Sequence, residues 1–192
     1  MLDLISVGGN LGSITRAIAR LGEKFRLVCK GSELIGENPI VLPGVGSFGA
    51  FIKAINQSGL KYPLISAIKS GAPFLGICVG MQVLFDKSEE SPDVKGLGII
   101  SGDVVRFKAP KVPQVGWNRI TPRREGYEKG HVYFVNSYYA RPQDESVILY
   151  TADYGGTFCA AVKHKNITAF QFHPEKSLYF GQSLLRRWLD AL

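Results

Sequence analysis

The sequence predicts an α/β protein in three layers, with helices on both faces of a doubly wound, mixed sheet. Two observations predict this class. In the first half, short apolar runs alternate with segments of helical periodicity, as in parallel sheets whose crossovers are helices. In the second half, runs rich in β-branched and aromatic residues follow one another between turn residues, which favours an antiparallel extension of that sheet. The length fits one domain over residues 1–192.

The first half begins with an apolar run at residues 2–7 that ends in two glycines, which is typical of a buried parallel strand. Apolar residues then recur at helical spacing over 13–21, and Gly22 ends this helix. The same two patterns continue along the chain. They predict strands at 25–29, 39–42 and 73–77, and helices at 47–57, 61–70 and 80–85.

The second half contains apolar and aromatic runs of strand length. They predict strands at 97–107, 111–120, 132–138, 147–150, 158–163 and 167–172. The chain closes with a helix over 181–192, whose apolar residues are spaced to pack against the sheet. Between the strands, His131 and His164 are expected in loops because polar residues surround them.

Composition and charge narrow the functional classes. The chain carries 23 Lys and Arg against 16 Asp and Glu, a net charge of +7, but the basic residues are scattered. This favours a solvated surface with one face turned to an acidic partner over nucleic-acid binding. There is no apolar run of the ~18 residues of a membrane span, no signal-peptide pattern, and no disulfide framework among three widely spaced cysteines. We expect a reduced, cytoplasmic protein that binds neither membranes nor nucleic acid.

The strongest chemical signal lies where the strand at 73–77 meets the next helix. Cys78 stands at this junction, with a glycine two residues before it and another two residues after it. Such a strand–turn–helix junction is a nucleophile elbow: it exposes the side chain, and the free N–H groups at the helix start favour a thiolate. The alternative is a buried structural cysteine between two packing glycines. Cys29 and Cys159 lack such a turn, and both are expected in the core.

A cysteine nucleophile needs a base, and the base needs a group that fixes its tautomer. His173 is the candidate base, because it follows the apolar strand at 167–172 and precedes Pro174 and Glu175. In an extended chain, residues two apart point to the same side, so Glu175 can bond one ring nitrogen while the other faces Cys78. The alternative is a surface histidine beside a capping glutamate.

A second glycine-rich turn, formed by Gly44, Val45 and Gly46, closes the strand at 39–42. Its glycines allow a peptide N–H to turn toward a developing oxyanion, and the N–H of Val79 would be the second donor. The alternative is an ordinary turn between a strand and a helix.

These motifs together resemble the class I glutamine amidotransferases, and residues 76–82 and 172–177 carry the resemblance. A second set of segments is similar to the glutaminase subunits of imidazole glycerol phosphate synthase. These segments are residues 42–48, 96–100, 111–118 and 133–139. The resemblance implies a flavodoxin-like fold and hydrolysis of L-glutamine to glutamate and ammonia without metal or cofactor. It also implies a heterodimer, in which ammonia passes to a (β/α)8-barrel cyclase of histidine biosynthesis.

The resemblance also implies roles for individual residues. By motif position, Cys78 is the nucleophile, His173 the general acid and base, and Glu175 its orienter. The other matched positions are Gln82, Glu90, Ser137 and Tyr138 for glutamine binding, Gly44, Val45, Gly46 and Val79 for the oxyanion, and Asn10 and Lys176 for the partner interface. The alternative for Gln82 and Glu90 is a solvated helix face, and for Ser137 a sheet surface.

The chain departs from the family pattern at residues 5–7, where Ile-Ser-Val replaces the usual Asp-Tyr-Gly, and at Gln114 and Asn136, which replace common histidines. The first change leaves room for a different ammonia acceptor, such as that of a surface-sugar amidotransferase. An inert regulatory subunit on the same scaffold and a cysteine peptidase with the same elbow are two further hypotheses. The complete Cys-His-Glu set argues against the inert subunit, and a peptidase would leave Gln82 and residues 112–118 unexplained.

Overall fold

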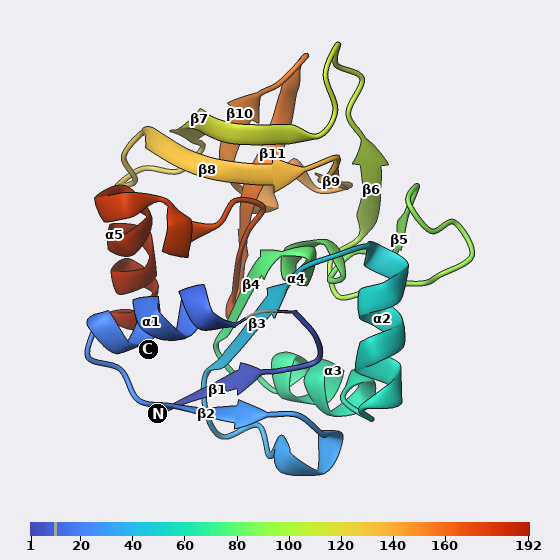
Figure 1. The fold of residues 1–192 in the computed structure, drawn as a ribbon, viewed down its shortest axis with the longest axis vertical. Helices are drawn as coiled ribbons and strands as arrows, with labels where there is room; N and C mark the ends of the chain where they lie inside the picture. Colours follow the sequence, from blue (N-terminus) through green and yellow to red (C-terminus); the bar gives the residue numbers. More distant parts are fainter. Residues whose placement is uncertain (10) are drawn as a thin grey trace.

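The computed structural model describes residues 1–9 and 11–192. A nine-stranded sheet forms the middle layer of the described chain, as the sequence predicts. Helices α1 (Gly12–Arg20) and α5 (Leu178–Leu189) lie on one side of it, and α2 (Phe48–Gln57) and α3 (Lys61–Lys69) lie on the other (Figure 1). No helix in this part of the chain is long and apolar enough to cross a membrane.

The parallel part of the sheet comes mainly from the first half of the chain. Its strands pair in the order β2 (Phe25–Val28), β1 (Leu2–Ile5), β3 (Ile40–Gly44), β4 (Phe74–Cys78) and β12 (Ile167–Phe170). Every residue of β1, β4 and β12 is buried. Layers on both faces leave these strands no solvent-exposed side, which explains their continuous apolar runs.

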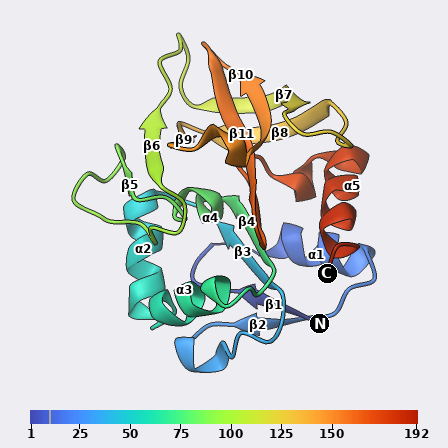
Figure 2. The same cartoon turned by 180° about the vertical axis from the view of Figure 1, so that it is seen from behind.

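The antiparallel part continues from β12 through β11 (Thr157–His164), β10 (Ile148–Asp153), β7 (Gln114–Pro122) and β8 (Gly130–Asn136). A separate three-stranded sheet joins β5 (Lys87–Ser88), β6 (Gly102–Arg106) and β9 (Tyr138–Pro142). Seen from behind, these strands lie together at the end of the molecule away from α1 and α3 (Figure 2). Short 3-10 helices follow β2, β9 and β12, at Gly31–Glu33, Glu145–Val147 and Pro174–Lys176.

Several element boundaries differ from the prediction. Only the second half of the expected strand 97–107 is a strand, because Gly98 has a φ of +59° and residues 97–100 bond back to the turn around Leu84. The expected helix 80–85 is the single turn α4 (Val79–Gln82). Strand β9 was not predicted, because its residues continue the apolar run of β8 and only the bend at Ser137 separates them.

Two predictions about single side chains were also wrong. Cys29 is exposed rather than in the core, because it follows β2, which is the edge strand of the sheet. His131 and His164 belong to strands β8 and β11 rather than to loops, and both are paired in the ladders, with Arg119 and Ile167 respectively. The expected burial of Cys159 is confirmed.

The topology brings three strand ends together. Gly44 at the end of β3 pairs with Cys78 at the end of β4, and Phe170 at the end of β12 pairs with Ile77. The chain beyond β12 reaches His173, which forms a bridge to β8. Ligands of open α/β sheets gather at the carboxyl ends of the strands, so this edge is the candidate site.

Candidate active site

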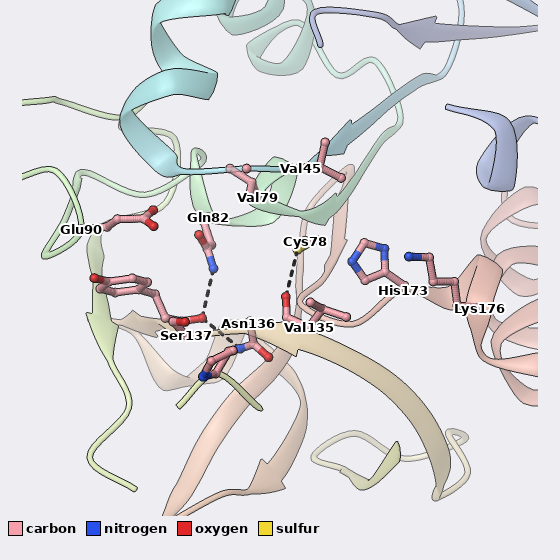
Figure 3. A pocket seen from close by; sticks show the side chains of 13 residues that line it. Val45, Cys78, Val79, Gln82, Glu90, Val135, Asn136, Ser137, His173 and Lys176 are labelled. Atoms are coloured by element: carbon pink, nitrogen blue, oxygen red, sulfur yellow. Dashed lines mark hydrogen bonds between the residues drawn. The ribbon is translucent and has the colours of Figure 1, made fainter. Parts of the chain in front are cut away.

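A cavity of about 370 Å³ opens at the carboxyl ends of β3 and β4. Figure 3 shows Cys78 in the middle of this cavity, Glu90 toward one end and His173 with Lys176 toward the other. Its volume lies within the range of small-molecule sites, about 300–1,000 Å³. It is lined by Val45, Gly46, Cys78, Val79, Gln82, Glu90, Pro113, Val135, Asn136, Ser137, Tyr138, His173 and Lys176.

Cys78 occupies a strained elbow between β4 and α4. Its φ is +55°, in the left-handed region that residues other than glycine rarely adopt. Neighbouring glycines let the backbones approach: a Cβ on Gly80 would overlap the carbonyl oxygen of Leu42, and one on Gly44 would overlap the backbone nitrogen of Gly80. The glycines around Cys78 therefore allow α4 to pack directly on β3.

Glu175 orients His173 inside the protein. Its Oε1 lies 2.8 Å from Nδ1 of His173, and both side chains are only 7% exposed. Burial lowers the pKa of His173, but hydrogen bonds with Cys78 and Glu175 outweigh this effect and raise that pKa from the usual 6.5 to about 9. The imidazole is therefore protonated at neutral pH and stands beside the sulfur of Cys78.

The backbone on either side holds His173 in place. Its N–H donates to the carbonyl of Tyr133 at 3.0 Å, and its own carbonyl accepts from the hydroxyl of Ser177 at 2.6 Å. The same hydroxyl accepts from the N–H of Tyr133 at 2.9 Å. The position of the imidazole is thus fixed by β8 and by the start of α5.

Two more groups approach the sulfur of Cys78, which is almost fully buried. The carbonyl oxygen of Val135 lies 4.0 Å from Sγ, as the dashed line in Figure 3 marks. Nε2 of the buried Gln171 lies 3.9 Å from Sγ. The sulfur therefore has polar neighbours besides His173.

The structure places Gln82 in the cavity wall rather than on a solvated helix face. Gln82 is buried, and its Nε2 donates to the carbonyl of Tyr138 and to Oε1 of Gln171, both at 3.0 Å. Ser137 and Tyr138 are half-buried and line the same side of the cavity from the bend between β8 and β9. These three sequence-predicted residues are thus brought together.

Glu90 lines the cavity at the end away from His173. Its Oε2 accepts from the backbone N–H of Phe48 at 2.7 Å, at the first residue of α2. This contact satisfies one of the free N–H groups at the helix start and holds the half-buried carboxylate in position.

The residues expected around the oxyanion separate into two groups. Val45, Gly46 and Val79 line the cavity next to Cys78. Gly44 is buried behind them as the last residue of β3. Gly46 has a φ of +90°, a conformation that glycine adopts without steric cost.

Of the two residues expected at a partner interface, Lys176 is exposed and lines the cavity beside His173 (Figure 3). Asn10 lies outside the described residues. No cluster of three or more His, Cys, Asp or Glu side chains in the described chain could hold a metal ion.

Sequence reasoning did not assign a site role to Pro113, Val135, Asn136 or Gln171. Pro113 and Val135 line the cavity but have no polar side chain that could mark them. Nδ2 of Asn136 donates to the carbonyl of Tyr138 at 2.9 Å, and its buried Oδ1 finds no partner among the described residues. Gln171 directly follows the apolar strand β12, and no motif around it distinguishes it from a core residue.

The resemblance read from the motifs is confirmed by comparison with known proteins. The family model of glutamine amidotransferase class-I matches residues 8–191. The imidazole glycerol phosphate synthase subunit HisH of Rhodopirellula baltica is 44% identical over 191 residues, which cover 95% of this chain and 93% of that protein. The subunit of the same name from Geobacillus kaustophilus is 43% identical over 202 residues, covering 98% and 96%.

Solved structures agree on the fold. A crystal structure described as a glutamine amidotransferase superposes with a TM-score of 0.81 at 23% identity, covering 98% of this chain and 97% of the other. That likeness confirms the three-layer arrangement. Because the identity is only 23%, it is evidence for the fold alone. The family model and the near full-length relatives together show that the chain belongs to the class-I glutamine amidotransferases, within the HisH subunits of imidazole glycerol phosphate synthase.

Proposed function

We propose that this chain hydrolyses the side-chain amide of L-glutamine at Cys78 and delivers the ammonia to a cyclase partner. One observation carries the proposal: His173 contacts both Cys78 and Glu175 at a single cavity. A sulfur nucleophile, a base beside it and a carboxylate that orients the base are the groups that amide hydrolysis through a thioester requires. The names of the relatives support the same activity.

In the first half-reaction, the thiolate of Cys78 attacks the side-chain carbonyl carbon of glutamine, and negative charge moves to the oxygen. Backbone N–H groups of the 44–46 loop and of Val79 stabilise that oxygen. His173, which is protonated at neutral pH, gives its proton to the departing nitrogen. The C–N bond then breaks, ammonia leaves, and a thioester remains on Cys78.

In the second half-reaction, water hydrolyses the thioester. His173 takes a proton from the water while the oxygen adds to the carbonyl carbon. The C–S bond then breaks, glutamate leaves, and the sulfur returns to a thiolate beside a protonated imidazole. The carboxylate of Glu175 stabilises that imidazolium.

The remaining cavity residues suit the α-amino and α-carboxylate ends of the substrate. Glu90 offers a carboxylate for the ammonium group at the end away from His173. Ser137 and Tyr138 present the bend between β8 and β9 to the substrate backbone, and Gln82 supports that bend through its hydrogen bond to the carbonyl of Tyr138. We assign these four residues to glutamine binding.

The partner docks, in this proposal, over the mouth of the cavity. Val45 and Val135 are exposed apolar side chains in the cavity lining, and further exposed apolar side chains lie on neighbouring segments: Val115 and Trp117 on β7, which pairs with β8, and Leu178 and Tyr179 just after Lys176. Exposed apolar patches with a polar rim are typical of protein interfaces. The net charge of +7 suits an acidic partner face.

The partner is proposed to be a (β/α)8-barrel cyclase that forms a heterodimer with this chain, with Asn10 and Lys176 at the interface. Covering the mouth has a chemical purpose, because ammonia that escapes into water is protonated and loses its lone pair.

We also propose a single domain over 1–192, supported by the sheet that joins both halves of the chain. A reduced, cytoplasmic location is supported by the three free thiols.

The test combines the chain with a candidate barrel cyclase and measures ring closure with glutamine or with ammonium as the nitrogen source. The proposal expects ring closure from ammonium by the cyclase alone, and from glutamine only when this chain is present. Glutamine hydrolysis without ring closure, with ammonia consumed by another acceptor such as an activated sugar, would contradict the assignment of the partner.

A further inference from the structure

Gln171 is a buried polar residue that joins two parts of the cavity wall. It follows directly on β12, and its N–H donates to the carbonyl of Ala160 at 2.9 Å. Its Nε2 lies 3.9 Å from Sγ of Cys78, and its Oε1 accepts from Nε2 of Gln82 at 3.0 Å. The residue is fully buried, and a buried amide is costly unless its polar atoms find partners, so both contacts stabilise its position.

The hydrogen-bond network fixes which end of the Gln171 amide meets the sulfur. The backbone carbonyl of Tyr138 can only accept, so the group of Gln82 that faces it at 3.0 Å is the NH2 end. The same NH2 group faces Gln171, which therefore presents its oxygen to Gln82. Nε2 of Gln171 remains for Cys78, and a donor rather than an acceptor meets the sulfur.

We infer that Gln171 is a positioning residue whose NH2 group holds the sulfur of Cys78 beside His173 and favours its ionised form. This rests on the proposed function, since it takes Cys78 as the nucleophile. A hydrogen bond donated to the charged form of a group stabilises that form, and more strongly in a buried site than in water. Because Gln171 also accepts from Gln82, it connects the nucleophile to the wall assigned to the substrate backbone.

Other charged groups act on the sulfur and have to be kept constant. His173 contacts it directly, and Glu175 acts through His173. The other titratable side chains that line the cavity are Glu90, Tyr138 and Lys176. A change at Gln171 alone leaves all of these in place, so its effect on the sulfur can be separated from theirs.

The experiment measures how fast iodoacetamide alkylates each cysteine of the full chain as a function of pH, by mass spectrometry of its peptides. Gln171→Met keeps the length of the side chain and removes the donor. We expect Cys78 to react about tenfold more slowly at neutral pH in this variant, with its rate profile moved to higher pH. An unchanged rate and profile for Cys78 would overturn the inference.

Internal and matched controls separate this effect from general loss of structure. Cys29 is exposed and should react equally in both chains, whereas burial raises the pKa of Cys159 to about 12 and keeps it unreactive. Gln114 is also a buried glutamine, but it lies outside the described cavity lining. Gln114→Met should leave Cys78 as reactive as in the unmodified chain, and an equal slowing there would overturn the inference.

A second measurement needs no variant of Gln171 and serves if Gln171→Met does not fold. In the nitrogen-15-labelled chain, the side-chain NH2 signals of Gln171 should shift at the pH midpoint of Cys78 alkylation. This shift should disappear in Cys78→Ala, and signals that behave alike in both chains would overturn the inference. The proposed function fails separately, if Cys78 of the unmodified chain reacts no faster than Cys29.

Discussion

The carboxylate of Glu175 lies 2.8 Å from Nδ1 of His173, and both side chains are almost entirely buried. A carboxylate can only accept, so Nδ1 keeps its proton in both the charged and the neutral imidazole, and Nε2 is the nitrogen that gains or loses a proton beside Cys78. Pro174, between the two residues, fixes one backbone torsion of this short segment. The geometry thus sets both the tautomer and the charge of the residue proposed as acid and base.

The raised pKa of His173 predicts a pH dependence of stability. Its pKa is about 9 in the folded chain and about 6.5 when unfolded, so the folded state binds the proton more tightly. This contribution is fully present below about pH 6.5 and is lost as the pH rises toward 9. The urea midpoint of the unmodified chain should therefore fall over this interval, and His173→Gln should remove that part of the fall. His131→Gln, at an exposed position, is the matched control and should leave the slope unchanged.

Removal of the charge at position 175 should lower both the pKa of His173 and the rate of glutamine turnover. Glu175→Gln keeps an acceptor near Nδ1 but loses the attraction that stabilises the imidazolium. We expect the titration midpoint of His173, followed by nuclear magnetic resonance, to move down from about 9. Glutamine turnover should drop about 100-fold or more. A variant that keeps full turnover would show that Glu175 is no more than a structural neighbour.

Gly80 should be intolerant of a side chain because of its contact with β3. A methyl group there would overlap the carbonyl oxygen of Leu42, a backbone atom that cannot move aside. Gly80→Ala should destabilise folding by about 2–3 kcal/mol, measured by urea denaturation. Gly22→Ala is the control: the site is open, and its φ of +81° alone should cost about 1 kcal/mol. Equal losses in the two variants would mean that close packing at the elbow contributes nothing.

The sequence predicted the parallel core and the elbow because local signals determine them. Strands buried on both faces need continuous apolar runs, and the turn at Cys78 needs small neighbours. Both features can therefore be recognised as patterns in a single sequence. Strand β9 is not marked in this way, since only two polar residues, Asn136 and Ser137, interrupt the apolar run where the chain passes from one sheet to the other. Likewise, the exposure of Cys29 depends on β2 lying at the edge, which is a property of strand order.

The site could be predicted only as far as its chemistry lies in short motifs. Cys78, His173 and Glu175 carry reactive groups next to glycines or proline, and the structure brings them together. Gln171 has the same surroundings in sequence as a core residue, and its contact with the sulfur arises from the pairing of β12 with β4. Long-range pairing of this kind cannot be read from composition or periodicity.

The exposed apolar side chains on the segments around the cavity should contribute to partner binding. Trp117 is 49% exposed on β7, and it stacks edge-on against Tyr133 with ring centres 6.0 Å apart. Trp117→Asp should weaken association with the cyclase at least about tenfold, since aromatic anchors dominate interface energies. Tyr62→Asp is the control, because Tyr62 is exposed on α3 at the other end of the molecule (Figure 1). Equal affinities of the two variants, measured by calorimetry, would place the interface elsewhere.

Replacing the nucleophile in the assembled complex tests the central claim most directly. Cys78→Ala removes the sulfur and leaves the described surface around the cavity unchanged, so the variant should bind the cyclase as before. Glutamate release from glutamine should fall to the uncatalysed background, while ring closure driven by added ammonium continues. Glutamine turnover that persists in this variant at the unmodified rate would contradict the assignment of Cys78.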